Sequence, residues 1–202
     1  MALQKNITVQ ANPSDQTAEN PTPDVARCTD IGHAALTRLL QPYALTVNWI
    51  GGGASIPGSH FGEPEAGLIG GNLYVRDDTP IHSALHESCH YICMDSERRQ
   101  ALHTDAGGDY DEENAVCYLS ILLADQLENY DRNHMMQDMD RWGYTFRLGS
   151  ARKWFEQDAG DAQKLLLQRG IIDHHDRPTW SLAQTPLKTS TSGTNTPLRT
   201  RY

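Results

Sequence analysis

The stretch from Ser83 to Tyr91 reads Ser-Ala-Leu-His-Glu-Ser-Cys-His-Tyr and contains the pattern His-Glu-x-x-His at residues 86–90. Residues four apart lie on the same face of an α-helix, so a helix here would direct the imidazoles of His86 and His90 to one point. Imidazole nitrogens are common ligands of divalent transition metals. Glu87 follows His86 directly, where its carboxylate could reach a metal-bound water without binding the metal. The stretch therefore predicts half of a metal site with a base beside it.

The residues around this motif indicate that it lies on a helix. Thr79 is a favourable N-cap residue, and Pro80 suits the first helical position, where its missing N–H is not needed. Apolar residues then recur at helical spacing, at Ile81, Ala84, Leu85, Cys89, Ile92 and Cys93. The competing interpretation is an ordinary helix that carries two surface histidines and an exposed glutamate. Because the start signals, the spacing and the motif agree, we favour the metal site.

A catalytic metal site usually has three protein ligands and one open position, so the motif needs a further ligand. A second helix, predicted from residue 111 to residue 127, begins far enough beyond His90 for the chain to turn and run back. Its first turn offers two carboxylates, Glu112 and Glu113. We expect Glu112 to be the ligand, because it lies on one helical stripe with the apolar residues Ala115, Leu119 and Leu122. Glu113 is the alternative, and it lines up instead with Val116, Cys117 and Ser120.

Two further residues near the motif have competing structural interpretations. The spacing Asp109-x-x-Glu112 also fits a capping box, which would engage Glu112 with backbone N–H groups at the start of its helix. His82 precedes His86 by one helical turn on the same stripe. One small ion cannot easily bind three such positions, so we expect His82 to support the site or the first turn rather than to bind the ion.

The arrangement His86-Glu87-x-x-His90 with Glu112-x-x-Ala115 resembles that of the gluzincin class of zinc metallopeptidases. This resemblance implies a zincin-like fold and a Zn²⁺ ion held by His86, His90 and Glu112. It also implies that Glu87 acts as the general base on a metal-bound water in the cleavage of a peptide or amide bond.

A more local resemblance, over about residues 45–100, is to the elongation factor P hydroxylases. It is carried by residues 83–91, the pair Arg98-Arg99, the dipeptide Glu63-Pro64 and the strand from Leu73 to Arg76. This second resemblance implies Fe²⁺ in place of Zn²⁺, bound by two histidines and one carboxylate, and hydroxylation of a protein side chain. A third alternative is a zincin that has lost catalysis and only binds a partner.

The rest of the chain predicts an α+β fold of zincin-like minimal metalloprotease architecture, with a small antiparallel sheet or hairpin packed on a mainly helical bundle. Helices are expected at residues 24–40 and between residues 124 and 170, with a break near Gly143 and a new start at Ser150. Strands are expected at residues 45–50 and 67–75. Asn72 to Arg76 would be the edge strand that lines the cleft and pairs with an extended substrate.

The chain has 202 residues, which indicates one domain, expected at residues 24–182. We expect residues 1–23 to be a disordered leader without signal-peptide features, and residues 183–202 to be a flexible tail. No apolar run approaches the length of a membrane span. Four cysteines form no disulfide framework, which favours a reducing cytoplasm.

The net charge is −9 and there is no basic stripe, so nucleic-acid binding is not expected. Acidic residues gather next to the predicted site, at Asp105, Asp109, Asp111, Glu112 and Glu113. We interpret most of this cluster as a solvated turn whose acids complement the helix dipole. The same charge would also attract a basic peptide or protein substrate.

Overall fold

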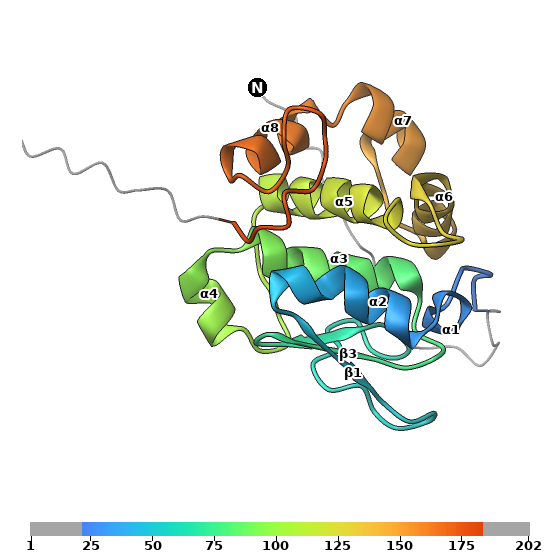
Figure 1. The fold of residues 1–202 in the computed structure, drawn as a ribbon. Helices are drawn as coiled ribbons and strands as arrows, with labels where there is room; N and C mark the ends of the chain where they lie inside the picture. The colour runs from blue at the N-terminus through green and yellow to red at the C-terminus, as the bar shows by residue number, and fades with distance from the viewer. Residues whose placement is uncertain (1–21, 184–202) are drawn as a thin grey trace, which may run out of the picture.

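The computed structural model describes residues 22–183, so the predicted leader and tail lie almost entirely outside the described residues. The fold is α+β, as expected (Figure 1). Its helices are α1 (Cys28–Ile31), α2 (His33–Leu40), α3 (Ile81–Cys93), α4 (Ser96–Ala101), α5 (Tyr110–Ala124), α6 (Arg132–Trp142), α7 (Ala151–Gln157) and α8 (Gly160–Gln168). Two short 3-10 helices are η1 (Gln41–Tyr43) and η2 (Arg147–Gly149), and the strands are β1 (Thr46–Trp49), β2 (Gly67–Ile69) and β3 (Asn72–Val75).

The three strands form a mixed sheet in the order β1-β3-β2. β2 and β3 pair antiparallel, with Leu68 opposite Leu73, across the turn at residues 70–71. β1 pairs parallel with β3, with Trp49 opposite Val75, because the long connection at residues 50–66 carries the chain across to the far side of β3. The predicted antiparallel hairpin is confirmed for β2 and β3, whereas the parallel pairing of β1 departs from the expected antiparallel sheet. The assignment of residues 72–76 to an edge strand is wrong, because β3 is the central strand.

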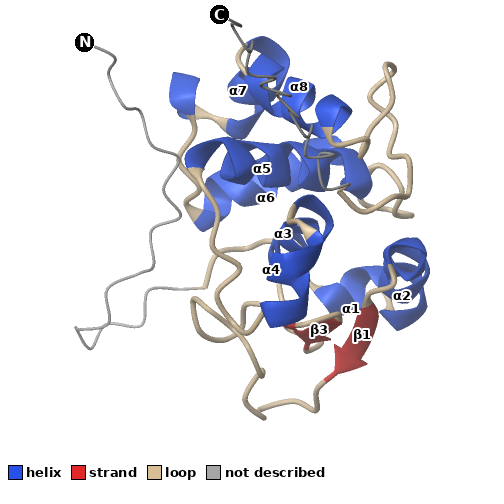
Figure 2. Ribbon diagram, turned by 90° about the vertical axis from the view of Figure 1, so that its left-hand side faces the viewer, coloured by secondary structure: helices blue, strands red, loops and turns tan. Residues whose placement is uncertain are grey.

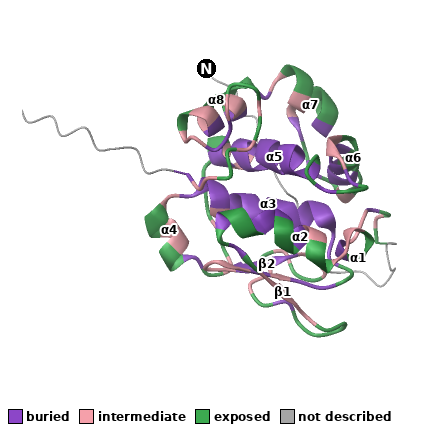
Figure 3. Cartoon of the chain, viewed as in Figure 1, coloured by how far each residue is buried: buried purple, intermediate pink, exposed green. Residues whose placement is uncertain are grey.

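The helices form layers above this sheet (Figures 1 and 2). α3 lies on the sheet, α5 lies above α3, and α7 and α8 lie on top of α5. Every residue of α3 except Tyr91 is buried, and α5 is buried from Asn114 to Ala124 (Figure 3). A helix that is apolar on all sides has no single packing stripe. The apolar pattern of α5 therefore does not indicate whether Glu112 or Glu113 faces α3.

Helix boundaries follow local signals, with two corrections. The helix predicted at residues 24–40 is split at Gly32, whose φ of 76° separates α1 from α2. α3 begins one residue later than expected, with Pro80 as its N-cap, while the hydroxyl of Thr79 accepts a hydrogen bond from the backbone N–H of Arg76. The break at Gly143 and the new start at Ser150 are confirmed, because Gly143 ends α6 in the left-handed region and Ser150 caps α7.

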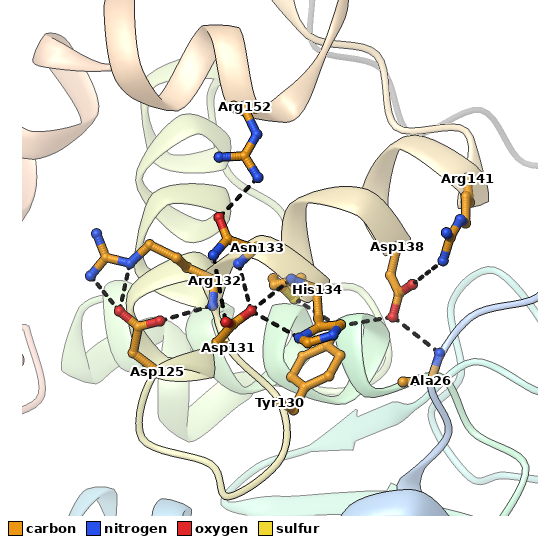
Figure 4. Close-up of polar contacts among 11 residues, drawn as sticks. Ala26, Asp125, Tyr130, Asp131, Arg132, Asn133, His134, Asp138, Arg141 and Arg152 are labelled. Carbon is orange, nitrogen blue, oxygen red and sulfur yellow. Dashed lines mark hydrogen bonds and ion pairs between the residues drawn. The ribbon is translucent and has the colours of Figure 1, made fainter.

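The start of α6 shows how polar contacts fix the upper layer (Figure 4). The carboxylate of Asp131 accepts hydrogen bonds of 2.9 Å from the backbone N–H groups of Asn133 and His134, so Asp131 is the N-cap of α6. Further along the helix, the buried carboxylate of Asp138 accepts hydrogen bonds from the backbone N–H of Ala26 at 3.0 Å and from the hydroxyl of Tyr130 at 3.1 Å. Asp138 thereby attaches the N-terminal part of the described chain to α6.

We expect Asp131→Ala to lower the free energy of unfolding by about 1 kcal/mol, because two N–H groups of the first turn lose their acceptor. Asp131→Asn should stay close to wild type, since asparagine caps helices equally well. The pKa of Asp131 is lowered, chiefly by the hydrogen bond from the His134 N–H. Its contribution is therefore present above the ordinary aspartate pKa of about 3.9 and is lost below it, so the effect of Asp131→Ala should shrink on acidification. Urea titrations at neutral and acidic pH measure the free energy of unfolding of each variant. An equal loss of stability in Asp131→Ala and Asp131→Asn would contradict the capping role.

Within residues 22–183, no helix combines the length and the apolar character that a membrane crossing requires.

Candidate metal site

α3 brings the two motif histidines together, as the spacing predicts. The Nε2 atoms of His86 and His90 lie 3.1 Å apart, and both side chains are buried. Two ligands at zinc–nitrogen distances of 2.0–2.1 Å and tetrahedral angles would lie about 3.4 Å apart, so the observed separation suits one shared ion. Burial lowers the pKa of His90 to about 4 and that of His86 well below its usual range. Both imidazoles are therefore neutral at pH 7, which is the form that binds metals.

The structure places Glu113, rather than Glu112, beside these histidines. Its carboxylate oxygens lie 3.4 Å from Nε2 of His90 and 3.8 Å from Nε2 of His86. The carboxylate of Glu112 instead forms ion pairs with Arg98 at 2.7 Å and Arg169 at 2.8 Å. The expectation that Glu112 faces the histidines is therefore wrong, and the alternative, Glu113, has the geometry of a third ligand.

The physical reason is that α5 is buried on nearly every side, so its apolar residues do not mark the face that contacts α3. The contact with α3 is marked by small side chains instead. Cys117 and Ser120 of α5 lie next to Cys89 of α3, on the stripe that begins at Glu113. Small residues let two helices approach closely, so Cys117 and Ser120 were a sequence signal that the stripe of Glu113 faces α3. The choice of Glu112 relied instead on the number of apolar residues on its stripe.

The capping-box interpretation of Glu112 is half right. Asp109 is the N-cap of α5 and accepts a hydrogen bond of 2.9 Å from the backbone N–H of Glu112. The carboxylate of Glu112 does not return to Asp109, since each of its oxygens is bound by an arginine.

Glu87 lies where a base would be needed. It is 5% exposed and borders a cavity of about 260 Å³ together with both histidines and Glu113. The rest of the cavity wall comes from two loops, with His60 and Phe61 on one side and residues 104–108 on the other. Burial, followed by the negative charges of Glu65, Glu113 and Asp105, raises the pKa of Glu87 to about 8. Nitrogen and oxygen atoms of His86, Glu87 and His90 lie within 4.8 Å of one another, so a cation there would also be close to Glu87.

Behind the histidines lies an aromatic cluster. The ring of Tyr144 lies 5.6 Å from that of His86 and 5.5 Å from that of His82, and Trp142 lies 5.0 Å from His82. His82 is fully buried, and its expected role in supporting the site stays a prediction. Neither its ring nitrogens nor the Nδ1 atoms of His86 and His90 have a hydrogen-bond partner among residues 22–183. The Nε2 atoms of His86 and His90 are within hydrogen-bonding distance of each other, at 3.1 Å, and apart from this contact packing holds the imidazoles.

Sequence reasoning missed Glu65, which lies close to Glu87. Its carboxylate accepts a hydrogen bond of 3.0 Å from the indole nitrogen of Trp142, and burial raises its pKa. Glu65 is half-buried and follows the Glu63-Pro64 dipeptide in a loop, where no periodic pattern marks a residue that faces the interior.

A larger cavity of about 520 Å³ lies elsewhere, between α2, the loop after α5 and Trp180. Its ionisable lining consists of Arg38 and Glu128, and neither the motif histidines nor Glu87, Glu112 or Glu113 line it. We therefore place the candidate site in the smaller cavity, where the ionisable groups converge.

The donor set suits a divalent transition metal, because two neutral imidazoles and one carboxylate are the ligands that Zn²⁺ and Fe²⁺ accept in proteins. Comparisons of the chain with protein families, with curated proteins and with solved structures found no match. The geometry of the residues is thus the basis for any functional assignment.

We expect Glu113→Gln to weaken zinc binding by about 10-fold or more, since loss of a direct ligand should matter at least as much as loss of a residue that supports one. Chelator competition on the purified protein measures the dissociation constant. Asp111→Asn, an exposed acid in the same first turn, is the control and should leave zinc binding unchanged. Equal affinity in the Glu113→Gln variant and wild type would exclude Glu113 as a ligand.

Proposed function

We propose that the protein is a metal-dependent hydrolase of gluzincin type, a zinc metallopeptidase that cleaves a peptide or amide bond. The observation that supports this most is the convergence of three donors on one point, with Nε2 of His86 and His90 3.1 Å apart and the Glu113 carboxylate 3.4 Å from His90. His86, His90 and Glu113 would hold the ion. When bound, a Zn²⁺ ion supplies a Lewis acid for the carbonyl oxygen and lowers the pKa of water to about 7.

Glu87 is the residue to which we assign the proton transfers. Its carboxylate borders the cavity and forms no hydrogen bond with any residue in the part of the chain that the structure describes. In the proposed reaction, the ionised form of Glu87, which a cation held by the histidines would favour, takes a proton from the attacking water as the water oxygen bonds to the carbonyl carbon. Glu87 then delivers this proton to the amine nitrogen as the carbon–nitrogen bond breaks. The products are a carboxylic acid and an amine.

The cavity also supports a basic peptide or protein as the substrate. Its carboxyl groups are those of Glu87, Asp105 and Glu113, and no lysine or arginine of residues 22–183 lines it. Its volume of about 260 Å³ suits one side chain of an extended segment rather than a large cofactor. We further propose a cytoplasmic location, which is supported by four buried cysteines that all remain free thiols.

We expect Glu87→Gln to retain one zinc ion per chain and to lose at least about 100-fold in turnover, which is the scale of general acid–base catalysis. The assay is cleavage of a mixed-sequence peptide library by the zinc-loaded protein, followed by mass spectrometry. Glu97→Gln, on the exposed first turn of α4, is the control and should cleave like wild type. Full activity in the Glu87→Gln variant would exclude the proposed mechanism.

The identity of the metal tests the reaction class independently. Two histidines and one carboxylate also bind Fe²⁺ in oxygenases. Metal analysis of protein purified without oxygen should give stoichiometric zinc. Stoichiometric iron with oxygen-dependent hydroxylation of a protein side chain would replace the proposal with a non-haem iron hydroxylase. Bound metal with no cleavage in wild type or variant would instead indicate a zincin that only binds its partner.

A further inference from the structure

We propose that Glu112 is a positioning residue: held between Arg98 and Arg169, it sets the direction of Glu113 and the place of one cavity wall. This inference rests on the proposed metal site, because it assigns a role toward the third ligand.

Glu112 is fixed at both its backbone and its side chain. Its carboxylate is 4% exposed, with one oxygen 2.7 Å from the guanidinium of Arg98 and the other 2.8 Å from that of Arg169. Its backbone N–H donates to Asp109 at the start of α5. Successive residues of an α-helix leave the axis about 100° apart, so a first turn that is held at Glu112 also holds the Cα–Cβ direction of Glu113.

The two arginines connect Glu112 to the other parts of the site. Arg169, at the end of α8, also donates a hydrogen bond of 2.6 Å to the backbone carbonyl of Cys93. Cys93 is the last residue of α3, the helix that carries His86 and His90. Through Arg169, the first turn of α5 is therefore tied to the C-terminal end of α3. The third ligand and the two histidines are held in one frame.

Arg98 makes the corresponding link to the cavity wall. Its guanidinium donates to the carbonyls of Ala106 and Gly107 at 2.7 and 3.0 Å, and both residues line the cavity. The next residue, Gly108, has a φ of 139°, and a Cβ there would lie 3.2 Å from Oε1 of Glu112. Glycine thus permits the loop to close directly over the carboxylate, which places the wall and Glu113 against the same group.

A purely structural role for Glu112 would produce a different result from a positioning role. Removal of one partner of a buried ion pair destabilises a protein wherever the pair lies, because the other charge is left without its partner. Only a positioning role would also change metal affinity and the geometry of the metal in protein that is still folded.

The test is Glu112→Gln, which keeps the shape of the side chain and removes its charge. We expect zinc affinity, measured by chelator competition at a temperature where the variant is folded, to fall about 10–100-fold. The visible absorption spectrum of the Co²⁺-loaded protein should also change, because it reports the arrangement of ligands. Arg98→Lys is a second variant that keeps the charge and loses the forked geometry, so it should shift both measurements in the same direction.

Asp138→Asn is the matched control, since Asp138 is another buried carboxylate with several partners, on α6 (Figure 4). It should lower stability and leave zinc affinity and the Co²⁺ spectrum unchanged. Weaker binding in Glu113→Gln with wild-type affinity and spectrum in both Glu112→Gln and Arg98→Lys would overturn this inference alone. A wild-type protein that binds no zinc, or unchanged affinity in Glu113→Gln, would overturn the proposed metal site and this inference with it.

Discussion

The packing of α3 against α5 is the constraint on which the rest of the site depends. Both helices are buried along most of their length, and the small residues Cys89, Cys117 and Ser120 occupy the contact between them. Ionisable side chains that project from either helix near this contact are therefore removed from water. A buried polar or charged group is costly unless it finds a partner, so the position of each ionisable group relative to the contact determines which partner it needs.

The charges in this layer are satisfied unequally. Glu112 has two arginines within 2.8 Å, which is the pairing that a buried carboxylate requires. Glu113 faces two neutral imidazoles, and neither Glu113 nor Glu87 forms an ion pair with a lysine or arginine in residues 22–183. Burial accordingly raises the pKa of Glu113 to about 7. A divalent cation between these groups would supply to Glu87 and Glu113 the positive charge that, of these three carboxylates, Glu112 alone receives from arginines within residues 22–183.

The sequence predicted what depends on neighbouring residues and missed what depends on distant ones. The motif helix, the break at Gly143 and the start at Ser150 follow from caps and spacing within a few residues. The direction of Glu112 depends on Arg98 and Arg169, which lie 14 and 57 residues away in the chain. The central position of β3 likewise depends on a long connection that gives no local signal. The small residues that follow Glu113 were a local signal that it faces α3, whereas the ion pairs that engage Glu112 had no local signal.

The imidazoles of His86 and His90 have no hydrogen-bond partner at Nδ1 within residues 22–183, whereas histidines that bind metals commonly donate that hydrogen to a carboxylate or carbonyl. Apart from the contact between their own Nε2 atoms, their orientation comes from the surfaces that surround them, such as the ring of Tyr144 against His86. Orientation by packing is only as precise as the frame that holds the packed elements. In this protein that frame includes the arginine contacts of Glu112, which join the end of α3 to the start of α5. If a metal binds here, these ion pairs would contribute to the positioning that hydrogen bonds to the histidines provide in many metal sites.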